Sequence, residues 1–466
     1  MPSAIHWFRR DLRITDNTAL HAATKAFSTV VPCYITSTWT AAHGWTGPKR
    51  QQFLSDSLRS LSSNLDSLGS RLIIRAGDAV EQLVGLAREC GAEAIYFNRD
   101  PDPFGKGVET RLMAKCKEAG IQCLGLKDTV LHEADETLTG TGQPYRVFTP
   151  YSKNWLSLPK PRPLGKVTSL GPASTVQSLP VPTLAHWGLT LPSDAQLLPA
   201  GERAARNRMK AFLETGILDL YGLNRNLPAG QTTSCLSQDL RFGLISIREL
   251  YARCQDHAAQ HPASAGSILT YTKELAWREF YMAILHNYPE VLEREFNPLL
   301  RNVEWPGTDD HFEAWTHART GFPIVDAGMR QLLTTGLMHN RVRMIVAMFL
   351  TKDLHLNWRL GEQFFHQHLI DAEIASNNGG WQWSAGTGAD AAPYFRVQNP
   401  WTQTLRYDPD GSYIKQWLPE LAHVSAERFC EPPQDRRPLA PGYPLPMVDH
   451  SLERDRTLAR FKAGKV

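Results

Sequence analysis

The residues best suited to chemistry lie close together between Asp371 and Arg396, in the segment DAEIASNNGGWQWSAGTGADAAPYFR. This segment combines two acids near its start, two adjacent amides, two Trp at alternate positions, turn-forming residues and a terminal Arg. Because glycine costs about 1 kcal/mol relative to alanine inside a helix, Asn-Asn-Gly-Gly predicts an irregular backbone that a flat ligand can approach closely. Trp381 and Trp383 are two residues apart, so on a helix they would point at different targets. The plainer interpretation is a loop between helices that carries two core Trp residues.

A second cluster, ELAWREFY, begins at Glu274. Glu274 and Trp277 are three residues apart, so they share one face of a helix. A Trp beside a carboxylate can stack on a nucleic-acid base while the acid accepts hydrogen bonds from the edge of that base. Taken alone, the cluster is better explained by a core Trp and an exposed Glu.

Two further clusters are suited to binding anions and acids. The hydroxyl-rich turn TTSCLS (232–237) opens a predicted helix and suits a pyrophosphate, although helix N-capping explains its Ser and Thr residues equally well. In HNRVRM (339–344), Asn340, Arg343 and Met344 lie on one side of a predicted helix and Arg341 is turned away from them. Arg343 is therefore available to pair with Asp371, and Arg341 to bind a phosphate.

Composition excludes several classes of protein. The chain has 466 residues with 42% hydrophobic and 21% charged residues, as expected of a soluble protein with two or three domains. No run reaches the roughly 18 apolar residues of a membrane span, and the start lacks a signal-peptide core, so we expect a cytoplasmic protein. The seven Cys form no CxxC and the 16 His form no HExxH, so we expect no metal site. With a net charge of only +3, any nucleic-acid surface must be a local patch.

The first part of the chain alternates apolar runs with helical stretches. The pattern predicts strands at 5–10, 30–36, 72–76, 94–98 and 121–126, with helices near 17–26, 49–67, 78–90 and 105–118. Strands buried on both faces and joined by helices indicate a doubly wound parallel five-stranded sheet, an α/β fold. No GxGxxG follows the first strand and no GxxxxGK[ST] occurs. The loop RRDLRITDN (9–17) is either an ion-paired turn or a ligand site at the carboxyl edge of the sheet.

The remainder of the chain is expected to be helical. We predict an α/β domain over 1–130, an interdomain linker over 131–201 that is Pro-rich from 156 onward, and an all-α domain over 202–466. The last of these shows apolar residues at three- and four-residue spacing, as in LTYTKELAWREFYMAIL.

Taken together, these motifs resemble the class I DNA photolyase/cryptochrome family over essentially the full length of the chain. The most specific are WFRRDLR, TSCLS, ELAWREFY, MHNRVRM and NNGGWQWSAGTGADAAPYFR followed by NP. The resemblance implies an amino-terminal α/β domain and a helical domain that holds FAD in a U-shaped conformation.

The resemblance also implies which residues bind the cofactor. Asn377 would face the flavin N5, where an amide oxygen can accept a hydrogen bond and so favour the reduced flavin. Together with it, the residues expected to bind FAD are Tyr221, Thr233, Ser234, Cys235, Leu236, Ser237, Tyr271, Arg343, Asp371, Ala372 and Glu373. Tyr271 and Leu337 stand where close relatives often have Trp, and Glu373 where Asp is usual.

Substrate and electron-transfer residues follow from the same resemblance. Together with Asn377, the residues expected to act on the substrate are Glu274, Trp277, Asn340, Met344 and Trp383. The residues expected to contact DNA are Arg225, Glu274, Trp277, Arg278, Tyr281, Asn340, Arg341, Arg396 and Gln403. A photoreduction chain of Trp381, Trp358 and Trp305 would lead from the flavin to the surface.

The implied activity is light-driven repair of cyclobutane pyrimidine dimers in UV-damaged DNA by a monomer without an obligate protein partner. Asn340 and Met344, in place of His, favour this reaction over six-four repair. The alternatives are a blue-light receptor of the cryptochrome kind and a non-photochemical electron-transfer flavoprotein. The resemblance implies an antenna chromophore as well. The segment 98–109, with Phe104-Gly105-Lys106, favours a deazaflavin over a folate, and Arg9, Arg10 and Arg50 either line its site or form surface ion pairs.

Overall fold

The amino-terminal domain is built on a parallel sheet with strand order β3-β2-β1-β4-β5. In the computed structural model, which describes residues 2–38, 43–434 and 437–464, the strands are β1 (Ser3–Phe8), β2 (Thr29–Thr36), β3 (Ile73–Ala76), β4 (Ala92–Asn98) and β5 (Gln122–Leu126). The helices between them are α1 (Thr18–Ala26), α2 (Pro48–Asp66), α3 (Ala79–Cys90) and α4 (Pro103–Ala119). The predicted doubly wound fold is confirmed. The first strand ends at Phe8, so the prediction that it extends to Arg10 was wrong.

Burial differs between the centre and the edge of the sheet. Every residue of β1 is buried, as its continuous apolar run predicts for a central parallel strand. In β5 no residue is buried and the first and third are exposed, because this strand pairs only with β4. The expectation of burial on both faces was therefore wrong for this strand, and β3 at the other edge is buried only in its first two residues.

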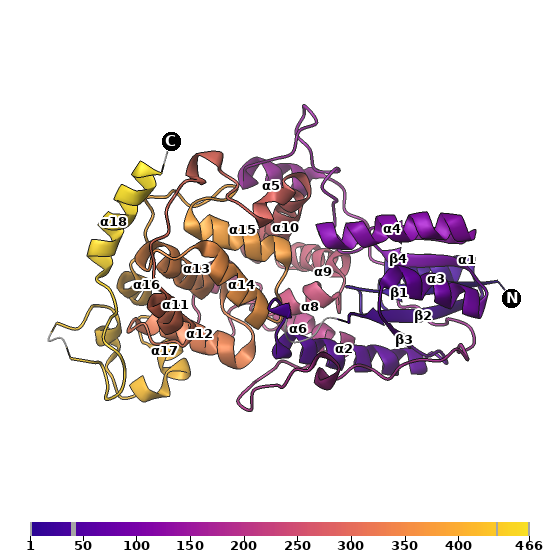
Figure 1. Cartoon of the computed structure of the whole chain (residues 1–466), viewed down its shortest axis with the longest axis horizontal. Coiled ribbons are helices and arrows are strands. Elements are labelled where there is room, and N and C mark those ends of the chain that lie inside the picture. The colour runs from indigo at the N-terminus through magenta and orange to yellow at the C-terminus, as the bar shows by residue number, and fades with distance from the viewer. Residues whose placement is uncertain (1, 39–42, 435–436, 465–466) are drawn as a thin grey trace.

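The helical domain begins at α6 (Figure 1). Its first helices share one core with a face of the sheet, and its later helices surround a second core. The segment from 158 to 201 runs along the α/β domain with only the short helix η2 (Leu184–Trp187), and α5 (Phe148–Ser157) packs on α10. The α-helices of this domain are α6 (Glu202–Glu214), α7 (Tyr221–Asn224), α8 (Ser237–Phe242), α9 (Ile247–Gln260), α10 (Ala265–Asn287), α11 (Asp309–Thr316), α12 (Pro323–Thr335), α13 (Asn340–Met348), α14 (Trp358–His368), α15 (Ile374–Ala385), α16 (Pro400–Tyr407), α17 (Ser412–Trp417) and α18 (His450–Ala463).

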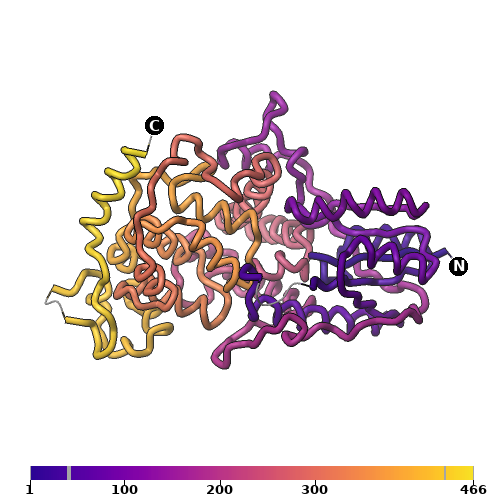
Figure 2. The backbone as a smooth tube through the Cα atoms, viewed as in Figure 1, coloured from indigo at the N-terminus to yellow at the C-terminus, as the bar shows by residue number. Residues whose placement is uncertain are grey.

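Figure 2 shows the chain beginning in the α/β domain and ending in α18 at the opposite end of the long axis. Among the helices the structure describes, none is long and apolar enough to cross a membrane.

Buried ion pairs join the two domains. Arg13 donates to Asp128 at 2.7 Å within the α/β domain, and Arg248 of α9 donates to the same carboxylate at 2.7 Å. Arg248 also pairs with Asp16 at 3.1 Å. These side chains are at most 4% exposed. Burial alone would raise the pKa of Asp128, but the two guanidinium groups hold it well below its usual range. The loop RRDLRITDN is therefore an ion-paired junction between domains.

The segment Asn-Asn-Gly-Gly lies inside a regular helix, α15, so the expected irregular backbone was wrong. Gly379 of this segment serves close packing, as does Gly361 of the neighbouring helix α14, whereas nothing lies within 4 Å of a Cβ added to Gly380. A Cβ on Gly379 would lie 2.1 Å from the Tyr281 ring of α10, and a Cβ on Gly361 of α14 would lie 2.1 Å from the Trp381 ring. The helical cost of glycine is thus accepted where a neighbouring aromatic ring needs the space.

We predict that Gly361→Ala lowers the free energy of unfolding by about 1–3 kcal/mol, because the new methyl group overpacks the contact with Trp381. Gly85→Ala in α3 is the matched control. Nothing lies within 4 Å of its added Cβ, so this variant is expected to gain up to about 1 kcal/mol. Denaturant titration measures both changes, and equal stability of the two variants would contradict the packing argument.

Candidate functional site

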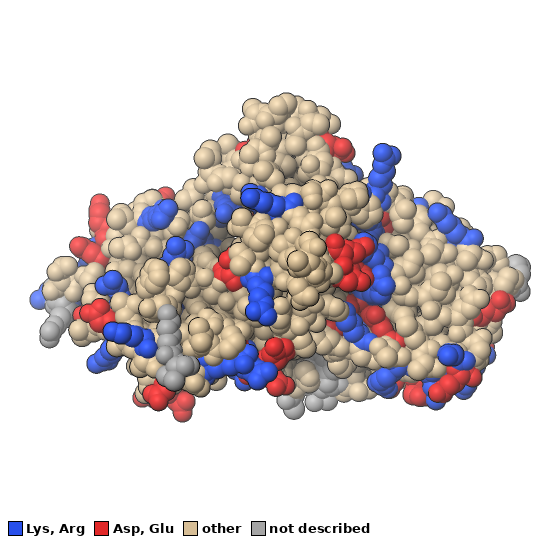
Figure 3. Space-filling view, turned by 90° about the horizontal axis from the view of Figure 1, so that it is seen from above, with Lys and Arg blue, Asp and Glu red and all other residues tan. Residues whose placement is uncertain are grey.

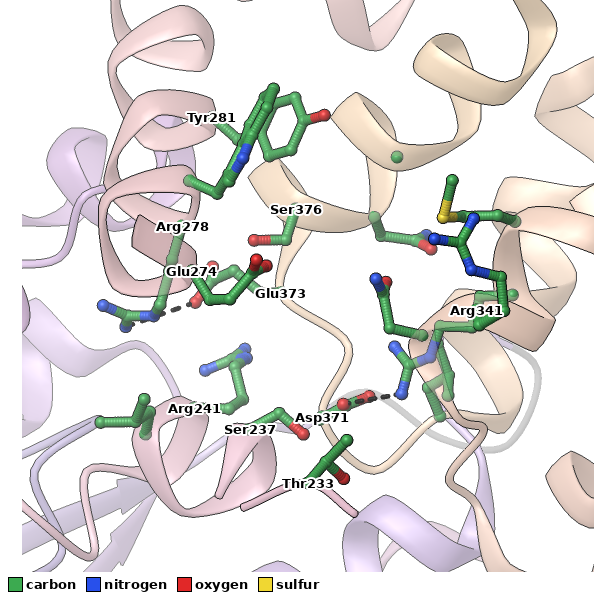
Figure 4. Close-up of a pocket in the computed structure, with 18 of the residues that line it drawn as sticks. Thr233, Ser237, Arg241, Glu274, Arg278, Tyr281, Arg341, Asp371, Glu373 and Ser376 are labelled. Atoms are coloured by element: carbon green, nitrogen blue, oxygen red, sulfur yellow. Dashed lines mark hydrogen bonds and ion pairs between the residues drawn. The ribbon is translucent and has the colours of Figure 1, made fainter. Parts of the chain in front are cut away.

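A cavity of about 530 Å³ opens in the helical domain beside the α/β domain (Figure 4). Residues from α7, α8, α10, α13 and α15 line it, together with the segment between α14 and α15. Of the residues expected to bind FAD, those that line this cavity are Tyr221, Thr233, Ser234, Leu236, Ser237, Tyr271, Arg343, Asp371, Ala372, Glu373 and Asn377. Cys235 is the exception, because its side chain is exposed and lies 3.8 Å from the Thr233 hydroxyl.

The polar groups of the cavity include unpaired acceptors and donors. Arg343 donates to Asp371 at 2.8 Å, as predicted from their spacing, while the second oxygen of Asp371 is buried without a hydrogen-bond partner. The buried indole N–H of Trp381 also lacks a partner. Buried polar groups are ordinarily hydrogen-bonded, so these atoms indicate a polar ligand within the cavity. The arrangement fits FAD, whose ring and ribose carry matching donors and acceptors.

Asn377 is oriented by a hydrogen bond that its amide nitrogen donates to the backbone oxygen of Glu362, at 2.9 Å. The neighbouring Asn378 donates to the Glu362 carboxyl at 2.9 Å, which anchors α15 on α14. Burial raises the pKa of Glu362 to about 7 although this hydrogen bond opposes the change. Since the Asn377 N–H is occupied, its oxygen remains as the acceptor.

Glu373 connects the cavity to the α/β domain. Its carboxylate pairs with Arg10 and lies 3.9 Å from the Arg278 guanidinium (Figure 4). Arg10 also pairs with Asp100 at 2.9 Å, and all four side chains are at most 12% exposed. The added methylene of Glu relative to Asp lengthens the reach of this side chain, which meets a cation from the other domain.

The residues expected to receive the substrate line the same cavity. They are Glu274, Trp277, Asn340, Met344 and Trp383. Trp277 stacks on Phe148 with ring centroids 3.6 Å apart, so its orientation is set by α5. Glu274 pairs with Arg225 across the opening. Burial raises the pKa of Glu274, and the Arg225 charge opposes the rise.

Two of the expected DNA contacts are held within the protein. Arg278 donates to the backbone oxygen of Thr129 at 2.8 Å and so faces the α/β domain. Tyr281 packs against Gly379 and its ring centroid lies 5.4 Å from that of Trp277. Their positions indicate a role in shaping the cavity wall, a role that the motif alone did not suggest.

A second hollow adjoins the first at Arg341, which lines both, whereas Asn340, Arg343 and Met344 line the first alone. Arg341 donates to Asn226 at 2.7 Å and lies over the Tyr407 ring at 4.6 Å. Arg396 and Gln403 line this hollow, as do Thr402 and the exposed Arg406, which the sequence reasoning missed. The available signal was a basic residue in the last turn of a short amphipathic helix, α16. Figure 3 shows that on one face Lys and Arg are interspersed with Asp and Glu and form no continuous basic field.

Two of the three Trp in the expected photoreduction chain are buried and the third is partly exposed. Trp381 lines the cavity, Trp358 is fully buried in α14, and Trp305 is half-buried beside Arg460, whose guanidinium lies 5.0 Å from the ring centroid. Trp358 donates to Glu295 at 3.1 Å. Trp315, which was not predicted, lies 6.1 Å from Trp381 between ring centroids.

The three Arg residues considered for an antenna site have partners within the protein. Arg9 pairs with Glu109, and Arg10 with Asp100 and Glu373. Arg50 lies on α2, where it donates to the Trp45 backbone oxygen at 2.5 Å and lies 3.3 Å from the His366 ring nitrogen. For Arg9 and Arg10 the structure therefore supports the ion-pair interpretation, although these pairs are buried and not at the surface.

Comparison with known proteins identifies the family. Residues 4–167 match the family described as DNA photolyase, and residues 271–463 match the FAD binding domain of DNA photolyase. The deoxyribodipyrimidine photo-lyases of Synechococcus sp. and Escherichia coli are 40% and 35% identical, over 99% and 100% of this chain and 96% and 99% of theirs. The chain belongs to the DNA photolyase/cryptochrome family.

Solved structures agree with this fold. A bacterial class III photolyase from Agrobacterium tumefaciens is 38% identical with a TM-score of 0.92, covering 100% of this chain and 98% of its own. The cryptochrome of Synechocystis sp. is 28% identical with a TM-score of 0.90, covering 98% of this chain and 99% of its own. An archaeal photolyase from Sulfolobus tokodaii, solved with two FAD molecules, is 30% identical with a TM-score of 0.85, covering 99% of this chain and 100% of its own.

We predict that Glu373→Gln lowers the free energy of unfolding by at least about 2 kcal/mol, because Arg10 and Arg278 lose a buried counter-charge. The same variant is expected to release FAD more readily, since Glu373 lines the cavity. Glu89→Gln is the matched control. Its pair with Arg75 is solvent-exposed, so a change below about 1 kcal/mol is expected. Denaturant titration measures the stability and flavin fluorescence measures the release of FAD. An equal loss of stability in the two variants would contradict the interdomain role of Glu373.

Proposed function

We propose that this protein is a light-dependent lyase that splits cyclobutane pyrimidine dimers in UV-damaged DNA. The observation that carries the proposal is a single cavity lined both by residues suited to FAD and by residues suited to the dimer. Asp371, Arg343 and Asn377 belong to the first set, and Glu274 and Trp277 to the second. A cofactor and a substrate held in one cavity are close enough for direct electron transfer. When bound in reduced form, FAD supplies an electron that light drives to the dimer.

The aromatic residues of the cavity support binding of a flipped-out dimer. Photolyases as a class extrude their target from the duplex, at a cost of a few kcal/mol that is smaller for a damaged base pair. Stacking on an aromatic side chain returns about 1–3 kcal/mol per base. Trp277 and Trp383 both line the cavity and are half-buried, so each retains exposed ring surface for stacking. Two such contacts are sufficient to offset the flipping cost.

Glu274 is suited to stabilise the dimer as it gains charge. Its raised pKa increases the fraction of protonated carboxyl, which can donate a hydrogen bond to a pyrimidine oxygen. Arg225 holds this carboxyl in the free protein and is itself one third exposed at the cavity opening. A DNA phosphate that draws Arg225 away would leave Glu274 free to meet the dimer.

Incubation of dimer-containing DNA with the FAD-loaded protein in light and in darkness tests the proposal. We expect restored pyrimidines only in the illuminated sample. Flavin photoreduction without dimer cleavage would indicate the cryptochrome alternative, and equal turnover in both samples would exclude a photochemical reaction.

Glu274→Ala is expected to lower the repair yield about tenfold or more, because it removes a group that stabilises charge at the reacting centre. Binding of dimer-containing DNA should change much less, since Trp277 and the phosphate-binding residues remain. Glu214→Ala, at an exposed position on α6, is the matched control and should leave repair unchanged. Quantum yield and DNA affinity measured on the same samples separate the two roles.

The hollow beside Arg341 is proposed to bind the DNA backbone through Arg396, Gln403 and Arg406. Removal of one cation that binds a phosphate reduces the slope of log affinity against log salt by about 0.9. Arg406→Ala is therefore expected to reduce that slope by about one. Arg454→Ala, at an exposed position on α18, should leave the slope unchanged. Affinities measured over a salt series test this, and identical slopes for all three proteins would place the DNA elsewhere.

The class within the family and the antenna chromophore are also part of the proposal. The motifs imply class I. The class III photolyase of A. tumefaciens is 38% identical to this chain, so class III is the competing class. For the antenna we propose a deazaflavin on the α/β domain. A second FAD, as in the photolyase of S. tokodaii, is the competing chromophore. The absorption spectrum of the purified protein distinguishes them.

We further propose that the protein works as a monomer in the cytoplasm without an obligate protein partner. A single chain supplies every residue that lines the cavity and the adjoining hollow.

A further inference from the structure

Three potential metal ligands converge on the outer side of the cavity wall. They are His257 and His261, at the end of α9, and Asp219, from the turn that precedes α7. One ligand atom from each lies within 4.8 Å of the others. The two His are four residues apart, so their rings share one face, and their centroids are 4.2 Å apart.

The contacts within this cluster already align two of the ligands. The Nε2 atom of His257 lies 2.9 Å from the Asp219 carboxylate, and both side chains are partly buried. One carboxylate oxygen and one imidazole nitrogen are therefore already close enough to approach a common ion.

The remaining ligand can reach a common ion by a small movement. Ligand atoms about 2.0–2.2 Å from a tetrahedral ion are about 3.3–3.6 Å from one another. His261 is exposed, so a change of side-chain rotamer can bring its nitrogen from within 4.8 Å to that separation. The partial exposure of the cluster also provides a path for the ion and room for a water as fourth ligand.

We propose that Asp219, His257 and His261 form a site for a borderline divalent transition-metal ion such as Zn²⁺. Two imidazoles and one carboxylate suit zinc, cobalt, nickel or copper, whereas magnesium and calcium prefer an all-oxygen set. The expectation that the chain has no metal site rested on CxxC and HExxH patterns, which a site assembled from two separate segments does not produce.

A metal ion bound by Asp219, His257 and His261 would connect the two segments that carry α7 and α10, which both line the cavity. Tyr221 follows Asp219 by two residues and lines the cavity, and α10, which carries Glu274 and Trp277, starts directly after the turn at Ser264. The walls already contact each other, because the Ser267 hydroxyl accepts from the Gly222 N–H at 3.1 Å. The proposed ion is structural, and the inference does not depend on the repair activity.

Titration of the untagged, FAD-loaded protein with Zn²⁺ tests the proposal by calorimetry, with Co²⁺ absorption in the visible range as a second readout. We expect one ion per chain and a thermal unfolding midpoint that rises with Zn²⁺. His261→Ala should weaken binding about tenfold or more and abolish the rise. Because His261 is exposed, this variant retains the packing of the free protein.

His423→Ala is the matched control, since His423 is an exposed histidine outside the cluster, and it should bind Zn²⁺ as the parent protein does. Retained binding in a His257→Ala/His261→Ala variant would overturn the proposal, because the ion would then occupy another site. Absence of binding to the parent protein would overturn it as well.

Discussion

Buried charge between the two domains is the constraint on which the rest of this structure depends. Asp128 accepts from Arg13 of its own domain and from Arg248 of α9, and Arg248 reaches Asp16 as well. A charge taken out of water is costly unless a partner stands beside it, and removing one partner leaves the other exposed to that cost. The two domains are thereby held in one relative position. That position brings Arg10 to Glu373 at the wall of the large cavity.

This arrangement joins the α/β domain to the wall of the large cavity. Arg10 stands just after β1, at the carboxyl edge of the sheet, where ligands of doubly wound folds commonly bind. Here that edge meets a second domain, and its guanidinium groups are matched by carboxylates from both. Arg278 completes the contact from α10, with one hydrogen bond to Thr129. A residue expected to contact DNA therefore also links the two domains.

The interior of the helical domain is arranged by aromatic rings that glycines admit. Tyr281 lies against Gly379 and Trp381 against Gly361, so α15 approaches both α10 and α14 closely. Close approach places Asn377 beside Glu362 and Trp381 at the cavity. The same helix thus presents an amide acceptor, a buried indole and, at Trp383, a half-buried ring to a single space.

The sequence by itself determined the elements and most of the site. Apolar runs of strand length and helical spacing predicted the sheet. The motifs taken together selected residues that line one cavity, and Cys235 alone among the predicted cofactor set lies off it. Only the tertiary structure decided which charges meet. Arg278 and Glu373 acquire their partners from segments more than 100 residues away. Arg406 lines its hollow together with Arg341 of α13. Local propensity likewise predicted a turn at Asn-Asn-Gly-Gly, because it records the helical cost of glycine. The compensating contact between Gly379 and Tyr281 exists only once the helices have packed.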